Sequence, residues 1–293
     1  EAVRGGLAQL RIRLTGGSGG HSGMDIHKGI ANANKLMNRL LLECLGECDF
    51  RIASVVGGGL RNAIPRESEA VIVIDPADET ALKSAMVEAF GAVQSEYATT
   101  DPELHLACES QSLTVTHAMP EEDQLAILMA IQTCPVGIHR MSPDIEHLVQ
   151  TSNNLARVEI ANGHVALQCL CRSSVDSEKD DHANSIACAF GLAGLQTEFS
   201  GSYPGWTPNP SSAIVATMKA LYEEKFEASP RVLACHAGLE CGILGTNYPE
   251  MDMVSFGPNI RGAHSPDECV QISSVQKFWA FFLDALQRIP NKA

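Results

Sequence analysis

Apolar residues follow two different periods along the first part of this chain. Within residues 7–14, positions 10 to 14 alternate between apolar and basic residues, which predicts a half-buried strand. After a glycine-rich turn, apolar residues recur at three-and-four spacing over 30–44, which predicts a helix, with Ser22 or Asp25 available as its cap. The pattern continues with predicted strands at 50–56 and 69–74 and a predicted helix at 78–97.

The same order of elements recurs in the next hundred residues. We predict strands at 112–116, 155–160 and 165–171, and helices at 121–133 and 177–195. We interpret this recurrence as a structural duplication, strand-helix-strand-strand-helix in each half. The expected arrangement is a sheet with helices packed on one face, an α+β layer structure.

The composition shifts at residues 201–210, where Pro, Gly and Ser punctuate the chain. Beyond this stretch the pattern predicts helices at 212–226 and 271–289, and strands at 231–235 and 252–256, alternating as in an α/β sheet. A parallel sheet must be covered on both faces, so this segment is expected to be only part of a domain. The sequence therefore predicts two domains, with a boundary near residues 201–210.

Charge and composition narrow the classes of partner. The chain has 21 Lys and Arg against 35 Asp and Glu, a net charge of -14, which argues against binding to nucleic acid or to an anionic membrane. The ten cysteines show no C-x-x-C spacing, so we interpret them as reduced thiols, most of them in the core. The first residues do not resemble a signal peptide, and together these features favour the cytoplasm.

Two polar segments of the first domain are candidates for chemistry. His21 lies in a Gly-Gly-His-Ser-Gly turn between a strand and a helix, where free backbone amides favour an anion and His21 could donate to a developing oxyanion. Asn62 follows three glycines and could hydrogen-bond a substrate carbonyl group. Each also fits a purely structural turn, and residues alone leave both interpretations open.

Three further candidates come at or after predicted strands. Arg172 ends an alternating strand, where its guanidinium could hold a carboxylate through two hydrogen bonds or form a surface ion pair. Glu240 and His264 lie in loops that follow predicted strands, a common place for ligand sites in α/β sheets. His264 is the best candidate for a metal ligand, although catalytic zinc usually needs at least three protein ligands.

Taken together, several motifs resemble one known family in their order and spacing across nearly the whole chain. They are Gly19-Gly-His-Ser-Gly23, Asp25-Ile-His-Lys-Gly-Ile-Ala-Asn-Ala-Asn34, Leu60-Arg-Asn-Ala-Ile-Pro-Arg66, Tyr203-Pro-Gly-Trp206, His236-Ala-Gly-Leu-Glu-Cys-Gly242, Tyr248-Pro-Glu-Met-Asp-Met-Val254 and His264-Ser-Pro-Asp-Glu268. They resemble the aminoacyl-histidine (Xaa-His) dipeptidases, which belong to the dinuclear zinc peptidases that also include aminoacylases, carboxypeptidases and carnosinases.

This resemblance implies an α/β fold made of two parts. Residues 1–198 would be an α+β lid with two similar halves, and 199–293 would be the carboxy-terminal part of a three-layer α/β catalytic domain. The other metal ligands and catalytic acids of the family would lie upstream of residue 1. The resemblance therefore implies that this chain lacks the amino-terminal catalytic segment and is inactive by itself.

The resemblance also implies roles for individual residues. His264 matches a zinc ligand, and His21 matches the lid histidine that polarises the scissile carbonyl group. Asn62 and Arg172 match residues that hold the substrate, Arg172 by its terminal carboxylate. Glu240 lies in a substrate-lining loop, where we expect it to bind the amino end.

For the complete protein, the resemblance implies a cytoplasmic metallo-dipeptidase that cleaves Xaa-His dipeptides with a zinc-activated water. Two zinc ions are expected, with cobalt or manganese as alternatives, and a homodimer is compatible with the family. Two other functions stay open. One is a broader dipeptidase or an N-acyl-amino-acid amidohydrolase, and the other is a non-catalytic lid or dimerisation module.

Overall fold

The computed structural model describes the chain except for residues 207, 210, 235–239, 262–267 and 289–293. The chain divides into two compact units. Unit 1 comprises Glu1–Ser173 and Ser177–Ser200, and unit 2 comprises Ser174–Asp176 and Gly201–Ala293. Each unit is considered separately below.

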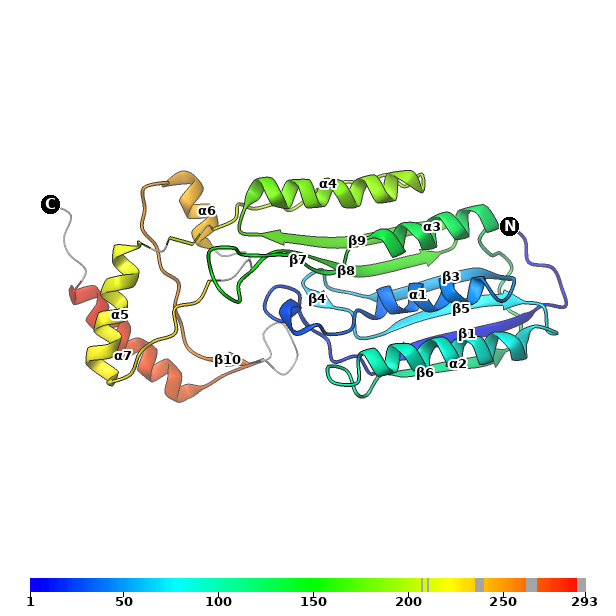
Figure 1. Cartoon of the computed structure of the whole chain (residues 1–293), viewed down its shortest axis with the longest axis horizontal. Helices are drawn as coiled ribbons and strands as arrows, with labels where there is room; N and C mark the ends of the chain where they lie inside the picture. Colours follow the sequence, from blue (N-terminus) through cyan, green and yellow to red (C-terminus); the bar gives the residue numbers. More distant parts are fainter. Residues whose placement is uncertain (207, 210, 235–239, 262–267, 289–293) are drawn as a thin grey trace. The chain divides into compact units, whose positions relative to one another are not determined.

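Unit 1 is built on one seven-stranded sheet with the strand order β6-β1-β5-β3-β8-β7, in which β9 also pairs with β8 (Figure 1). Every pair of neighbouring strands is antiparallel. The strands are β1 (Ala8–Thr15), β3 (Phe50–Gly58), β5 (Ser68–Ile74), β6 (His105–Gln111), β7 (Gly137–Met141), β8 (Val149–Ala161) and β9 (His164–Ser173).

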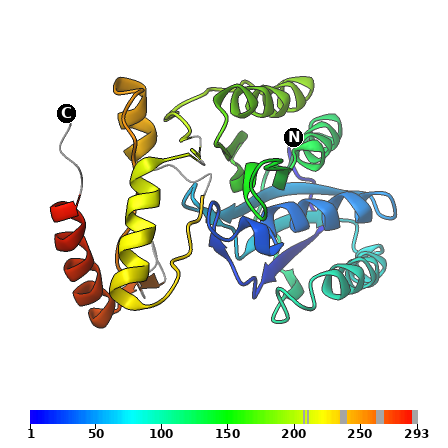
Figure 2. The same ribbon diagram turned by 60° about the vertical axis from the view of Figure 1, so that its left-hand side comes forward.

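The helices of unit 1 pack together against this sheet. Helix α1 contacts both α2 and α3, and the three lie next to one another along the sheet (Figures 1 and 2). Their apolar sides form one core with the strands, in which Leu40 of α1, Leu82 of α2 and Ile72 of β5 are fully buried. Burial of each such side chain contributes about 2 kcal/mol to folding. The helices are α1 (Ala33–Leu45), α2 (Glu79–Glu96), α3 (Glu121–Thr133) and α4 (Asp176–Leu192), with a short 3-10 helix, η1 (Ile26–Lys28).

Most of the predicted elements of unit 1 are present, with two differences. The strand predicted at 112–116 is wrong: the strand is β6 and ends at Gln111. Strand β7 was not predicted, because most of its residues are exposed and show no apolar alternation. The order strand-helix-strand-strand-helix does recur, with β7 added, but β6 pairs with β1 at the opposite edge of the sheet from β9.

Unit 2 contains α5 (Ala213–Phe226), α6 (Glu240–Asn247) and α7 (Ile272–Arg288). Ser212 is the N-cap of α5, and its side chain accepts a hydrogen bond from the backbone N–H of Val215 at 3.1 Å. A small core joins α5 to α7 through Leu221 and Phe281. The short strands β10 (Ile260–Arg261) and β11 (Cys269–Val270) pair with each other.

Both strands predicted for unit 2 are wrong over its described residues. Residues 231–234 and 252–256 run as irregular chain, although the helices predicted on either side of them are present. An apolar run alone does not make a strand, because its backbone groups also need a neighbouring strand to pair with. Among the described helices, none is both long and apolar enough to cross a bilayer.

Candidate functional site

His21 lies in β2 (Gly20–His21), a two-residue strand that pairs with β4 (Ala63–Ile64). The register places His21 opposite Ala63, the neighbour of the candidate residue Asn62. The backbone N–H of Ser22 donates to the carbonyl oxygen of Asn62 at 2.7 Å. Two of the candidate segments predicted from sequence are therefore held side by side.

The backbone around His21 fixes the state of its imidazole ring. The N–H groups of Gly23 and Met24 both donate to Nδ1 of His21, each at 3.1 Å. A ring nitrogen that accepts hydrogen bonds carries no proton, so the neutral ring carries its proton on Nε2. The turn therefore selects the tautomer in which Nε2 is the donor.

The amides of this turn are used within the turn itself. The N–H of His21 donates to the carboxylate of Asp25 at 2.8 Å, and those of Gly23 and Met24 are engaged as described. Burial raises the pKa of Asp25, but the hydrogen bonds from Lys28 and His21 outweigh it and keep that pKa below its usual value. The expectation that free amides here would bind an anion is wrong for these three groups, because a side chain of the same turn already accepts from each, and the N–H of Ser22 is engaged by the carbonyl oxygen of Asn62.

Arg172 contacts the same turn, although it lies 150 positions further along the chain. It lies near the end of β9, opposite Ser152 of β8, and is 7% exposed. Its Nε donates to Oγ of Ser22 at 3.4 Å. Ser22, the chain neighbour of His21, thus contacts Arg172 through its side chain and Asn62 through its backbone.

The buried side-chain amide of Asn154 connects these segments to helix α1. Nδ2 of Asn154, on β8, donates to the carbonyl oxygens of Arg61 at 3.3 Å and Ala63 at 2.8 Å. Its Oδ1 accepts from Nδ2 of Asn32 at 3.1 Å, and Asn32 is the N-cap of α1. The cap is therefore Asn32, and the prediction of Ser22 or Asp25 as the cap is wrong, because both belong to the preceding turn.

Asp101 anchors both ends of the segment that carries His21. This buried carboxylate accepts the backbone N–H of Ser18 at 2.7 Å and that of Ala31 at 2.9 Å. Gly19 has a φ of 65°, and a Cβ there would lie 2.4 Å from Cγ of Arg66, so the segment requires glycine at this position. Asp101 therefore fixes the start and the end of the segment, and the close approach of Arg66 leaves room only for glycine at position 19.

Sequence reasoning missed Ser22, Asn154 and Asp101 as parts of this arrangement. Asn154 ends a run of five polar residues, Gln150 to Asn154, all of them buried in β8. A polar run usually indicates a loop, so nothing in the pattern pointed to a buried strand. Asp101 follows a helix and has the sequence context of an ordinary turn residue.

The two remaining candidates belong to unit 2. Glu240 is exposed in the first turn of α6. His264 lies outside the described residues. Within the described ranges, no group of three His, Cys, Asp or Glu side chains is arranged to hold a metal ion. The described residues therefore do not fit a metal centre by themselves.

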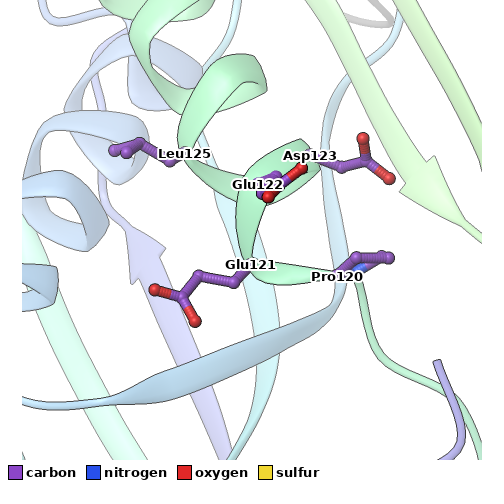
Figure 3. Close-up of a pocket in the computed structure, with 5 residues that line it drawn as sticks. All are labelled: Pro120, Glu121, Glu122, Asp123 and Leu125. Carbon is purple, nitrogen blue, oxygen red and sulfur yellow. The ribbon is translucent and has the colours of Figure 1, made fainter.

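A surface hollow in unit 1 lies apart from these candidates. Figure 3 shows it at the first turn of α3, lined by Pro120, Glu121, Glu122, Asp123 and Leu125. Three acidic side chains near a helix N-terminus stabilise the helix through its dipole. None of the candidate site residues lines this hollow, so it is not part of the arrangement around Ser22.

Comparison with known proteins agrees with the fold of unit 1. Residues 3–101 match the family of peptidase dimerisation domains, the M20 dimerisation family. Residues 3–101, which lie in unit 1, therefore resemble the dimerisation domain of these peptidases. It is 38% identical over all of its 293 residues to the cytosol non-specific dipeptidase of Escherichia coli (strain K12).

A solved structure is also similar to this chain over its whole length. The aminoacylhistidine dipeptidase of Vibrio alginolyticus matches 100% of the chain with a TM-score of 0.88 and 38% identity. The α/β fold with a lid sheet of this type is thus confirmed. The chain spans 60% of the length of each of these two relatives.

Proposed function

We propose that this chain forms the lid and the carboxy-terminal part of the catalytic domain of a dipeptidase, with residues 1–198 as the lid and 199–293 as the catalytic part. The substrate class is a dipeptide, Xaa-His in the first instance. The observation that supports this proposal is that Ser22, the chain neighbour of His21, contacts both Arg172 and the backbone of Asn62. A hydrogen-bond donor at His21 and a guanidinium that contacts the next residue suit a substrate that has a peptide carbonyl group and a carboxylate.

In this proposal His21 polarises the scissile carbonyl group. Its Nε2–H tautomer, fixed by the amides of Gly23 and Met24, donates to the carbonyl oxygen and stabilises the negative charge that develops on it. A donor that is already oriented has no reorganisation cost during the reaction. The side chain of Asn62 holds the substrate from the adjacent segment.

Arg172 is proposed to bind the terminal carboxylate of the dipeptide. Its guanidinium is buried and in contact with Ser22, which limits the positions it can take. A guanidinium pairs with a carboxylate through two parallel hydrogen bonds, which a lysine ammonium group cannot reproduce. Such a contact would select substrates by their length and favour dipeptides.

The metal requirement concerns the complete protein. We propose that it is a zinc enzyme, with cobalt or manganese as alternative metals, and that His264 is one of its ligands. The described residues provide no ligand set, so the contribution derived for this chain is limited to binding and orienting the substrate. Glu240 is proposed to bind the substrate's amino end, consistent with its exposed carboxylate on α6.

A cytoplasmic homodimer is part of the proposal. The domain matched by residues 3–101 is described as a dimerisation domain, and the Escherichia coli relative is named a cytosolic enzyme. That relative is also named non-specific, which favours a broader dipeptidase as the second candidate function. An N-acyl-amino-acid amidohydrolase and a non-catalytic dimerisation module are the remaining alternatives.

The test is made on the product of the full gene, with a dipeptide and the same dipeptide amidated at its carboxy terminus. Arg172→Lys is expected to raise KM for the free dipeptide roughly 10-fold to 100-fold, the loss of one charge-assisted hydrogen bond. The KM for the amide should change little. The matched control is Arg157→Lys, at a half-exposed arginine of β8.

Two results would contradict the proposal. Equal effects of Arg172→Lys on both substrates would remove Arg172 from the carboxylate site. Hydrolysis of N-acyl amino acids in preference to every dipeptide would favour the amidohydrolase. A panel of Xaa-His and other dipeptides then separates the narrow from the broad dipeptidase, and activity of the 293-residue chain alone with added zinc would show that its own residues suffice.

A further inference from the structure

Three cysteines of unit 1 gather where α3, β8 and β9 meet. Sγ of Cys134, just after α3, lies 3.8 Å from Sγ of Cys169 on β9, although the two residues are 35 positions apart. Cys171 lies two residues further along β9. All three carry free thiols, and the surrounding side chains include Ile186 and Phe190 of α4.

Asn153 of β8 lies between two of these thiols, those of Cys134 and Cys171. Its Nδ2 donates to Sγ of Cys134 at 3.7 Å, and its Oδ1 accepts from the thiol of Cys171 at 3.5 Å. The amide therefore lies between Cys134 and Cys171. Cys134 and Cys169 face each other directly, so this pair is the one arranged for a bond between sulfur atoms.

The two thiols of the pair differ in their surroundings. Cys134 is fully buried, whereas Cys169 is only partly buried, so Cys169 is the more exposed residue of the pair. A hydrogen bond from the Cys134 thiol lowers the pKa of Cys169 and outweighs burial, which raises it, while a hydrogen bond with Asn153 and the positive charge of Lys35 lower it further. Burial raises the pKa of Cys171 to about 12, and the hydrogen bond to Cys169 together with burial raises the pKa of Cys134, so Cys169 is the thiol of the three that ionises most readily.

We propose that Cys134 and Cys169 form a reactive dithiol site that a small peroxide converts into an intramolecular disulfide. The Cys169 thiolate attacks one oxygen of hydrogen peroxide, the O–O bond breaks, and a sulfenic acid and hydroxide form. The sulfur of Cys134 then attacks the sulfenic sulfur, the S–S bond forms, and the S–O bond breaks, and the departing hydroxyl group takes the Cys134 proton and leaves as water. Overall two thiols are oxidised, and one peroxide is reduced to two molecules of water.

Closure of this bond requires only a local movement. A disulfide has an S–S length of about 2.05 Å, so the two sulfur atoms must approach by a further distance of about 1.8 Å. The bond would tie the residue that follows α3 to β9, the strand that carries Arg172. The crosslink would also restrict the unfolded chain and so raise the midpoint of thermal unfolding.

The experiment is treatment of the chain with limiting hydrogen peroxide, followed by alkylation under denaturing conditions and peptide mapping by mass spectrometry. The expected product is a peptide containing Cys134 linked to one containing Cys169, with the loss of two hydrogen atoms, reversed by dithiothreitol. Cys134→Ser and Cys169→Ser should each abolish it. Cys171→Ser and Cys44→Ser should not.

The wild-type map alone is decisive if a variant fails to fold. Oxidation of the exposed Cys188 or Cys269 while Cys134 and Cys169 remain fully alkylated would overturn the proposal. A disulfide between Cys134 and Cys171 in place of the expected pair would overturn it as well, because Asn153 could not then separate these two thiols.

Discussion

Nε of Arg172 donates to Oγ of Ser22 across 150 positions of sequence, at 3.4 Å and in the buried interior of unit 1. This contact joins the end of the edge strand β9 to the turn that carries His21. It is the link through which a group proposed to hold a carboxylate is set relative to a group proposed to polarise a carbonyl.

Replacing Ser22 with Ala tests this link. The variant removes one acceptor for Nε of Arg172 and leaves the backbone hydrogen bond to Asn62 in place. At 3.4 Å the bond is long, so we expect a loss of about 1 kcal/mol in substrate binding, a KM raised roughly 5-fold in the full-length enzyme. An unchanged KM for the dipeptide would show that Arg172 is positioned without Ser22. Ser185→Ala, on the exposed face of α4, is the control.

Asp101→Asn should destabilise the protein through the segment that it anchors. An amide keeps one acceptor oxygen but presents an NH2 group to the second backbone donor, Ser18 or Ala31. Leaving that buried group unsatisfied costs about 2 kcal/mol, a fall of roughly 5 °C in the midpoint of thermal unfolding. Circular dichroism measures it. Asp49→Asn, at a side chain that is 80% exposed, should leave the midpoint unchanged.

Lys35 holds the end of α3, and its replacement by Met should weaken that end. Its Nζ donates to the carbonyl oxygens of Ile131, Gln132 and Cys134, which lie at or just beyond the end of the helix. We expect a loss of about 2 kcal/mol in the free energy of unfolding, measured with urea. If Lys35→Met unfolds at the same urea concentration as an exposed control, Lys219→Met, this capping role is wrong.

His182 should make the stability of the protein depend on pH. Its ring is 2% exposed and stacks on His139 of β7 with 4.1 Å between ring centroids. Burial lowers the pKa of His182, with a further contribution from His139, while Asp181 and Glu178 act in the opposite direction. Nε2 of His182 has no hydrogen-bond partner in the described structure. Protonation of His182 is therefore less favourable in the folded state than in the unfolded state.

The sign of the effect follows from the lowered pKa. An unfolded histidine takes up a proton near pH 6.5, whereas folded His182 does so at a lower pH. Unfolding therefore takes up a proton in between, and stability should fall as the pH drops below about 6.5, levelling off below the folded pKa. His182→Gln should flatten the pH profile of the unfolding midpoint, and His105→Gln, at an exposed site, should not. Identical profiles for His182→Gln and the wild type would count against this assignment.

Local patterns were enough to predict much of unit 1. Helix α3 begins at Glu121 and ends at Thr133, as its apolar spacing predicts, and β3 and β5 lie where alternation places them. The resemblance also named His21, Asn62 and Arg172 as one group of residues. Their roles in binding and catalysis remain predictions. His264 lies outside the described residues.

The sequence by itself determined where the backbone of unit 1 forms most of its helices and strands, because the hydrophobic period is encoded among near neighbours. Tertiary structure decided which strands pair, since β6 joins β1 at one edge while β9 joins β8 near the other. It also decided that the polar run ending at Asn154 is buried, because the partners of that amide come from residues 32, 61 and 63. A buried polar group is tolerated only when distant parts of the chain satisfy it, and no local pattern records those partners.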